Sequence, residues 1–166
     1  PNLMKVLSGS HELANSREPF WLKSALIADS VFMNKKFIAE RNDVALKTMQ
    51  ALYDAIEWWS KNPTEGNKII AKNLKMSLAD VELVIGKDGS GKDGGLYPYS
   101  FIEAARFCGV APGDPPFGQE NGQIVDHFKM TNEWWLKFGQ MKETADPSNG
   151  INCTLLGSLH NQGYGQ

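Results

Sequence analysis

The sequence predicts an α/β fold, in which a mostly helical chain rests on a partial sheet. Two short apolar runs, Met4–Leu7 and Ser24–Ile27, have the length and composition of buried strands. Five or six further segments carry apolar residues at the 3.6-residue period of a helix, with capping residues at their ends. Two strands cannot cover the apolar faces of that many helices. We therefore expect a second polypeptide or a further segment to complete the sheet.

The first forty residues are expected to begin with the strand at Met4–Leu7, which ends in a loop from Ser8 to His11. A polar, turn-rich segment from Ala14 to Trp21 then leads into the second strand at Ser24–Ile27. After a turn, the apolar pattern predicts a short helix from Val31 to Glu40.

The central stretch from Ala39 to Val84 predicts three consecutive helices. Apolar residues keep one face of each helix oily, and a polar residue stands at each start. The second start also has a proline at the first helical position. An acidic residue stands three residues after the cap, a pattern similar to a capping box. The expected N-caps are Asn42, Asn62 and Ser77, with Pro63 and Glu65 completing the second start.

A glycine-rich loop follows, from Gly86 to Gly95, and two nucleotide- or metal-binding motifs fail in it. A P-loop needs a hydroxyl where Asp93 stands, and a calcium loop starting at Asp88 would need glutamate where Tyr99 stands. The loop is therefore interpreted as a flexible surface connector.

The last third of the chain predicts two helices and a polar tail. Ser100 caps a short helix with Glu103 three residues later, and Gly109 stops it. The last long helix is expected from Gly122 to Phe138. From Lys142 onward the apolar pattern is poor, so the tail is expected to lie along the surface or fray.

Composition excludes several classes of protein. The 166 residues are 42% hydrophobic and 22% charged, which is ordinary for a globular domain. Seventeen basic and nineteen acidic residues leave a net charge of −2, so no nucleic-acid surface is expected. No apolar run approaches the length of a membrane-spanning helix.

Neither cysteines nor histidines show the spacing of a metal or catalytic site. Cys108 and Cys153 either form one disulfide or remain two thiols, and their spacing alone leaves both alternatives open. His11, His127 and His160 fall on different predicted elements, and no CxxC pair is present. We expect no metal, no cofactor and no catalytic residue.

The order of the helices resembles a known family. The pieces that carry the resemblance run from Lys5 to Met141 and are Phe37–Glu40, Ala55–Trp59, Asn62–Glu65, Ile69–Lys72, Lys75–Ser77 and Asn132–Trp135. They are similar to the C-terminal half of the periplasmic solute-binding proteins of nitrate/sulfonate/taurine-type ABC importers. The resemblance implies a type II periplasmic-binding-protein-like α/β fold.

The same resemblance implies how the chain is divided and what it does. Residues 1–23 would be the end of the second ligand-binding domain with the crossover, and residues 24–166 the C-terminal part of the first domain. The chain would then lack an N-terminal segment or a second chain. It would capture a small polar solute such as nitrate, a sulfonate or taurine, and deliver it to a membrane permease. Its location would be periplasmic or extracellular, as a lipid-anchored or soluble protein.

In the resembled family the loop before the return crossover faces the ligand, which places the candidate site between Ser10 and Trp21. Its side chains offer hydrogen-bond donors for a small oxyanion and an indole ring as an apolar wall. Each of these residues has a plainer alternative in forming a turn or packing in the core. The candidate ligand-binding residues are Ser10, His11, Asn15, Ser16 and Trp21.

Other aromatic residues are interpreted more cautiously. Tyr97 and Tyr99 fit a cleft wall and surface packing equally well. The adjacent pairs Trp58–Trp59 and Trp134–Trp135 point about 100° apart on their helices. In each pair we expect one ring to face the core and the other a neighbouring element, without a binding role.

Two alternative functions remain. One is an enzyme or enzyme fragment on the same fold, similar to a pyrimidine-precursor synthase, although the cysteine-rich iron-binding motif of that branch is absent. The other is a helical interaction module without a small ligand, which a large exposed apolar patch would favour.

Overall fold

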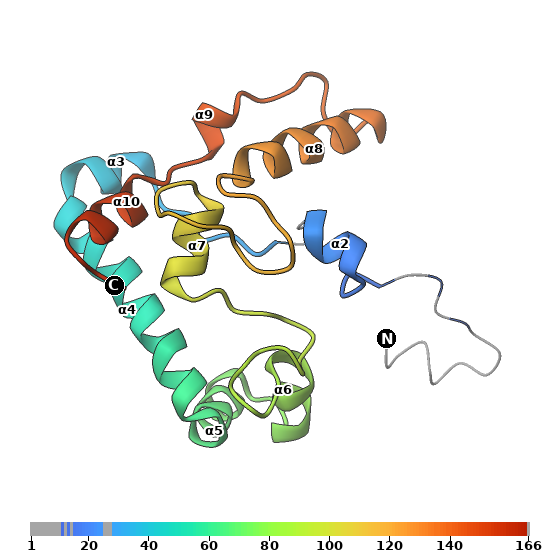
Figure 1. Ribbon diagram of the computed structural model, residues 1–166, viewed down its shortest axis with the longest axis vertical. Coiled ribbons are helices and arrows are strands. Elements are labelled where there is room, and N and C mark those ends of the chain that lie inside the picture. The colour runs from blue at the N-terminus through green and yellow to red at the C-terminus, as the bar shows by residue number, and fades with distance from the viewer. Residues whose placement is uncertain (1–10, 12, 14, 25–27, 166) are drawn as a thin grey trace.

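The computed structural model describes residues 11, 13, 15–24 and 28–165, and these residues form helices joined by turns and loops (Figure 1). The helices are α2 (Pro19–Ser24), α3 (Lys35–Glu40), α4 (Asn42–Lys61), α5 (Pro63–Leu74), α6 (Leu78–Ile85), α7 (Phe101–Phe107), α8 (Ile124–Lys137), α9 (Pro147–Gly150) and α10 (Thr154–Asn161).

The core lies where α4, α7 and α10 meet. Ala45, Met49 and Tyr53 recur every four residues along α4, so they form one buried stripe. Phe101 of α7 packs against this stripe, and α10 adds Leu159, which is 3% exposed. Burial of these apolar faces against one another holds the three helices together.

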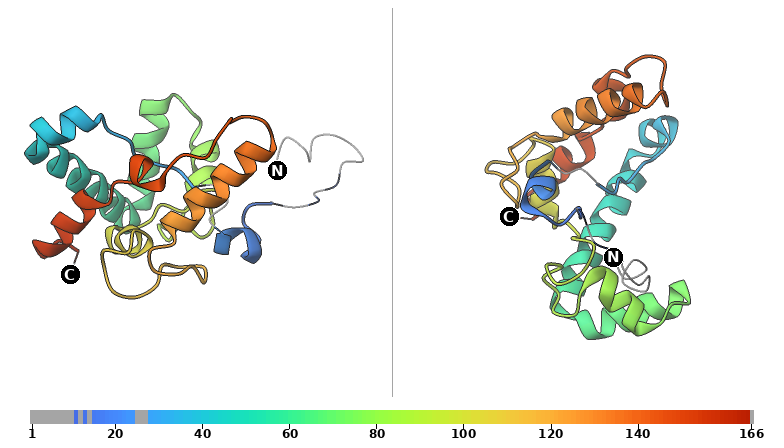
Figure 2. Two further views of the ribbon diagram at one scale, coloured as in Figure 1. Left: turned by 90° about the horizontal axis from the view of Figure 1, so that it is seen from above. Right: turned by 90° about the vertical axis from the view of Figure 1, so that its right-hand side faces the viewer.

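The remaining helices extend from this core in two directions. α5 and α6 pack on each other and form one end of the molecule, while α8 and α9 lie at the opposite end (Figures 1 and 2). At the α5–α6 end, Val81 and Asn67 are almost fully buried. The long α4 reaches from α3 beside the core to α5 (Figure 1).

Local start signals were mostly predicted correctly. The Ser77 hydroxyl accepts the Asp80 amide hydrogen, and Ser100 forms a complete capping box with Glu103. Pro63 occupies the first turn of α5, but the side chain of Asn62 does not cap that helix. Its side-chain amide instead donates to the Trp58 carbonyl oxygen at 2.9 Å and so caps the C-terminus of α4.

Two other start predictions need correction. α4 begins at Asn42 itself, and the residue before it caps the helix without a side-chain bond. The helix expected from Val31 begins at Lys35, where the Asn34 side chain accepts two backbone N–H groups.

The tail after Lys142 is more ordered than expected. It contains α10, whose leucines enter the core, and Cys153 beside it forms a disulfide with Cys108 at the end of α7. The alternative of two free thiols is therefore excluded. The disulfide joins residues 45 positions apart and fixes α10 on the core.

The predicted α/β fold is wrong for the part of the chain that the structure describes, because no strand is found there. Ser24, expected to start a strand, is the last residue of α2, and residues 25–27 lie outside the described part. The other predicted strand, Met4–Leu7, also lies outside it. A type II binding-protein sheet is thus replaced by helices packed on helices.

Apolar faces nevertheless remain uncovered in the described part. On α5 and α6, Ile69 and Leu83 are 45% and 53% exposed. Trp59 is buried and Trp58 is exposed, but Trp134 and Trp135 are both exposed, so the prediction of one core-facing ring fails for the second pair. The helices pack along narrower stripes than their apolar patterns suggested.

Candidate functional site

A pocket of about 570 Å³ opens beside the second half of α4. Four segments form it: α4, the glycine-rich loop, the stretch leading into α7, and the chain end after α10. The lining residues are Tyr53, Ile56, Glu57, Trp59, Ser60, Gly89, Ser90, Tyr97, Pro98, Ser100, Phe101, Ile102, Glu103, Tyr164 and Gly165.

One wall of the pocket is a row of three aromatic rings. Phe101 stands edge to face with Tyr53 at a centroid distance of 5.5 Å and with Tyr164 at 4.7 Å. Tyr53 and Phe101 are nearly buried because they also belong to the core. Such edge-to-face contacts fix ring orientation, so this wall is rigid.

The polar part of the lining is built around the carboxylate of Glu103. One of its oxygens accepts the hydroxyl of Tyr97 at 2.9 Å. The other accepts both the backbone N–H and the hydroxyl of Ser100 at 2.8 Å. Glu103, which completes the capping box of α7 with Ser100, therefore also binds the Tyr97 hydroxyl at the pocket.

A second tyrosine–carboxylate contact closes the chain-end side. Tyr164 donates its hydroxyl to Asp54 at 2.5 Å, which ties the chain end to α4. At the rim, Glu57 pairs with Lys61 one turn further along the same helix. Burial, and next the hydrogen bonds to Glu103 and Asp54, raise the pKa of Tyr97 and of Tyr164 above the usual value near 10.

The glycine-rich loop is anchored on α4 rather than free. The side chain of Asn67 accepts from the Trp59 indole N–H and donates to the Gly86 carbonyl oxygen, both at 2.8 Å. Gly89 has a φ of +79°, and a Cβ there would lie 2.2 Å from the Ser60 carbonyl oxygen. Glycine is required at this position, because the loop could not otherwise touch the end of α4.

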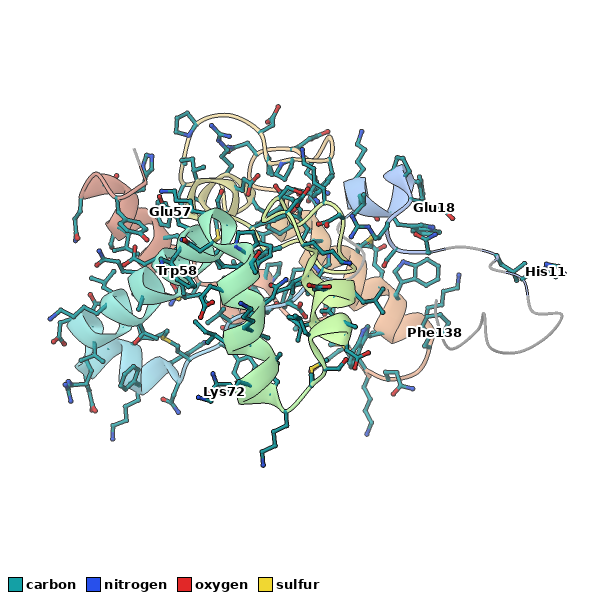
Figure 3. The ribbon with its side chains drawn as sticks, turned by 90° about the horizontal axis from the view of Figure 1, so that it is seen from below. His11, Glu18, Glu57, Trp58, Lys72 and Phe138 are labelled. Carbon is teal, nitrogen blue, oxygen red and sulfur yellow. A yellow bond between two sulfur atoms is a disulfide. The ribbon has the colours of Figure 1, made fainter. Side chains whose placement is uncertain are left out.

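The candidate residues predicted from sequence do not lie in this pocket. Ser10 is outside the described residues, and His11 is exposed and lies far from Glu57 (Figure 3). The Asn15 side chain accepts the Arg17 amide hydrogen at 2.9 Å, which is the turn that starts α2. Ser16 and Trp21 are half-buried, and Trp21 packs edge to face with Phe20. The turn alternative holds for Asn15, whereas Trp21 is not part of the core.

Of the two tyrosines considered for a cleft, Tyr97 lines the pocket. Tyr99 instead donates its hydroxyl to Gln119 and packs near Phe107. Glu103 was predicted only as the partner of the Ser100 cap, and no role in a site was predicted for Glu57 or Tyr164. No spacing could have found them, because their separation of over a hundred residues is closed by tertiary packing alone.

Metal-binding and membrane-spanning features were also sought in the described part of the chain. No cluster of three or more His, Cys, Asp and Glu side chains occurs there. None of its helices is both long enough and apolar enough to cross a membrane. His127 is half-buried near Phe107, and burial lowers the pKa of its imidazole.

Comparison with known proteins adds no relative. No family model matches the chain, and neither a curated protein nor a solved structure matches it.

Proposed function

We propose that the protein is the substrate-binding component of an ABC importer, which captures a small polar solute and delivers it to a membrane permease. The observation that carries the proposal is the pocket beside α4. Its volume of about 570 Å³ falls within the range of small-molecule sites, about 300–1,000 Å³. Aromatic rings fixed by the core stand beside carboxylates and hydroxyls, as in sites that enclose small polar molecules.

The importer assignment draws its support from the order of the helices. α3, α4, α5 and α8 fall on most of the segments that carry the family resemblance. The segments quoted for the resemblance are helices and turns, whereas the sheet that the resemblance also implies is not found in the described part of the chain. The proposed ligand-binding site consists of residues of α4, α7 and the chain end. It does not include the segment from Ser10 to Trp21.

The disulfide between Cys108 and Cys153 fits this role. Disulfides persist in oxidising compartments, so a place outside the cytoplasm agrees with the capture of solutes for import. We expect binding without turnover, and that expectation remains a prediction.

A thermal-shift screen tests the proposal. The panel is nitrate, methanesulfonate, taurine, choline, urea and uracil, so that anions, a zwitterion, a cation and neutral solutes are all represented. A ligand at a hundred times its Kd stabilises the folded protein by about 2.7 kcal/mol. For a chain of this size that corresponds to a rise in Tm of about 5–10 °C. Absence of stabilisation by every solute would refute solute capture.

A matched pair of variants locates the binding. Ser60 and Thr48 are exposed residues of α4, and each donates its hydroxyl to a carbonyl oxygen of the same helix. Ser60 lines the pocket and Thr48 does not. Ser60→Phe should fill the pocket and abolish the ligand-induced shift, whereas Thr48→Phe should preserve it.

The exposed aromatic residues of α8 favour a second candidate function, a helical interaction module. Trp135 is 53% exposed and Phe138, directly after α8, is 66% exposed. Phe138 stands at the free end of that helix (Figure 3). Clustered aromatic exposure of this kind is common at protein–protein contacts.

Sedimentation velocity over a wide range of protein concentration tests this second candidate. If α8 is an interface between copies of the chain, association should disappear in Trp135→Ser. Leu74→Ser, at the opposite end of the molecule and 63% exposed, should leave it unchanged. A monomer at every concentration would count against self-association.

A further inference from the structure

The charge of the pocket is one-sided. Glu57 and Glu103 line it, and Asp54 stands behind the Tyr164 hydroxyl. No lysine, arginine or histidine is found among the described residues that line it. Lys61 approaches from outside and is already paired with Glu57. An anionic ligand would therefore meet negative charge without a cation to hold it.

Five of the six hydroxyl groups that line the pocket donate hydrogen bonds within the protein. Tyr97 and Ser100 donate to Glu103, and Tyr164 donates to Asp54. Ser60 donates to a carbonyl oxygen of α4 at 2.7 Å, and Ser90 donates to Asp88 at 2.6 Å. Each hydroxyl has one proton and two lone pairs, and the Ser90 and Ser100 oxygens each already accept one backbone N–H. These five groups therefore face a ligand as acceptors, with fewer free lone pairs at the two serines.

The only side-chain N–H in the lining is also engaged within the described structure. The Trp59 indole N–H donates to Asn67. A nitrate or sulfonate needs several donors, and the pocket offers its oxygens few free ones. A ligand that brings its own N–H or polarised C–H groups matches the pocket instead.

Aromatic rings supply the rest of the wall, from Tyr53, Trp59, Tyr97, Phe101 and Tyr164. The faces of such rings attract cations, most strongly where water is excluded. The nearby carboxylates also affect the pKa of the pocket tyrosines. Burial comes first among the causes that raise the pKa of Tyr97, and the adjacent Glu103 carboxylate adds to it.

We infer that this pocket binds a small organic cation, an ammonium or guanidinium compound, in place of the oxyanion expected from the family resemblance. The inference rests on the proposed solute-binding function and specifies its ligand class. The carboxylates balance the charge of the ligand, the hydroxyl oxygens accept its N–H groups, and the rings cover its apolar surface.

Isothermal titration calorimetry with matched ligands tests the charge preference. Choline is compared with 3,3-dimethyl-1-butanol, its neutral isostere, and with methanesulfonate and nitrate. We expect choline to bind at least about tenfold more tightly than the neutral isostere, because the isostere fills the same space without the charge.

Two glutamates provide a matched pair of variants. The Glu57 side chain is 62% exposed and pairs with Lys61 on its own helix, while that of Glu65 is 63% exposed and pairs with Lys68. Glu57 lines the pocket and Glu65 does not. Glu57→Gln should weaken choline binding about fivefold, the ratio for losing one unit-charge attraction near water. Glu65→Gln should leave the affinity unchanged.

The outcomes separate this inference from the proposed function. Preferential choline binding that falls in Glu57→Gln and not in Glu65→Gln supports the inference. Equal binding of the neutral isostere, tighter binding of an anion, or equal effects of the two variants overturns it and leaves solute capture standing. Failure of all four ligands here and of the whole thermal-shift panel overturns both.

Discussion

Replacing Asn67 by leucine is expected to destabilise the end of the molecule that supports the pocket. Asn67 is 1% exposed, and its amide joins the Trp59 indole N–H to the Gly86 carbonyl oxygen. Leucine has the same number of side-chain heavy atoms with the same branching, but it neither accepts nor donates. The substitution would therefore leave one buried donor and one buried acceptor without partners.

The magnitude follows from those two groups. Each buried polar group left unpaired costs about 1–3 kcal/mol, so Asn67→Leu should lower the free energy of unfolding by about 2–6 kcal/mol. Guanidinium denaturation followed by far-ultraviolet circular dichroism measures this change, and a midpoint shift without a change in slope would identify it as a loss of stability. The pocket wall should loosen as well, because Trp59 loses its anchor.

Asn73→Leu is the matched control. Asn73 lies on the same helix, but it is exposed and donates only to the Ile69 carbonyl oxygen of its own helix. Its replacement should change stability by less than about 0.5 kcal/mol. If Asn67→Leu cost no more than Asn73→Leu, the assignment of Asn67 as the bridge between α4, α5 and the glycine-rich loop would be refuted.

A further variant separates the two bonds. Asn67→Asp keeps an acceptor for Trp59 but places a carboxylate oxygen against the Gly86 carbonyl oxygen, where the amide now donates. Protonating the aspartate restores a donor. The deficit of this variant relative to the native chain should therefore shrink as pH falls, whereas the deficit of Asn67→Leu should not.

Three further predictions concern the core. Replacing both Cys108 and Cys153 by serine should lower the free energy of unfolding by about 4 kcal/mol, by the loop-entropy estimate for 45 residues. The denaturation midpoint of this variant should be lower than that of the native chain, and a reductant should no longer change it. Leu159→Ala, at a 3% exposed position, should cost about 2–5 kcal/mol, and Leu74→Ala, at a 63% exposed one, far less. Burial lowers the folded-state pKa of His127, so the unfolded chain binds more protons than the folded protein below about pH 6.5, and the free energy of unfolding should decrease as the pH is lowered. Urea midpoints measured across this pH range should depend less on pH in His127→Gln than in the native chain.

Start signals were predictable because they are local. A serine three residues before an acidic residue at Ser77 and at Ser100, and a proline at position 63, act through groups within one helical turn. Asn62 failed as a cap because it stands between two adjoining helices. Its side chain bonds backward to α4, an alternative that the same local pattern permits.

The expected sheet failed for a different reason. A four-residue apolar run such as Ser24–Ile27 has the same appearance in a strand and at the end of a helix, and periodicity cannot separate the two. In the described part, Ser24 ends α2 and donates its hydroxyl to the Trp21 carbonyl oxygen. The tail was missed because α10 is only eight residues long, and its three leucines become core through contacts with α4 and the disulfide.

The pocket could not be derived from sequence because its walls come from four separate segments. Glu57 and Tyr164 are brought together by the packing of α10 on α4, which no residue spacing encodes. Glu103 gave a signal, but the signal was that of a helix start. The family resemblance placed the ligand-binding residues in a different segment, because it presumed a cleft between two α/β domains.

Structural and binding roles coincide at Glu103, and this limits how the pocket can change. Its carboxylate completes the capping box of α7 and also accepts hydrogen bonds from the hydroxyl groups of Ser100 and Tyr97. Exchanging it to suit an anion would remove its bond to the Ser100 backbone N–H, which is one half of the capping box, and would also leave the Tyr97 hydroxyl without its acceptor. Glu57, at the exposed rim, caps no helix and pairs only with Lys61 among the described residues. Changes in ligand preference that preserve the fold are therefore expected at Glu57 first.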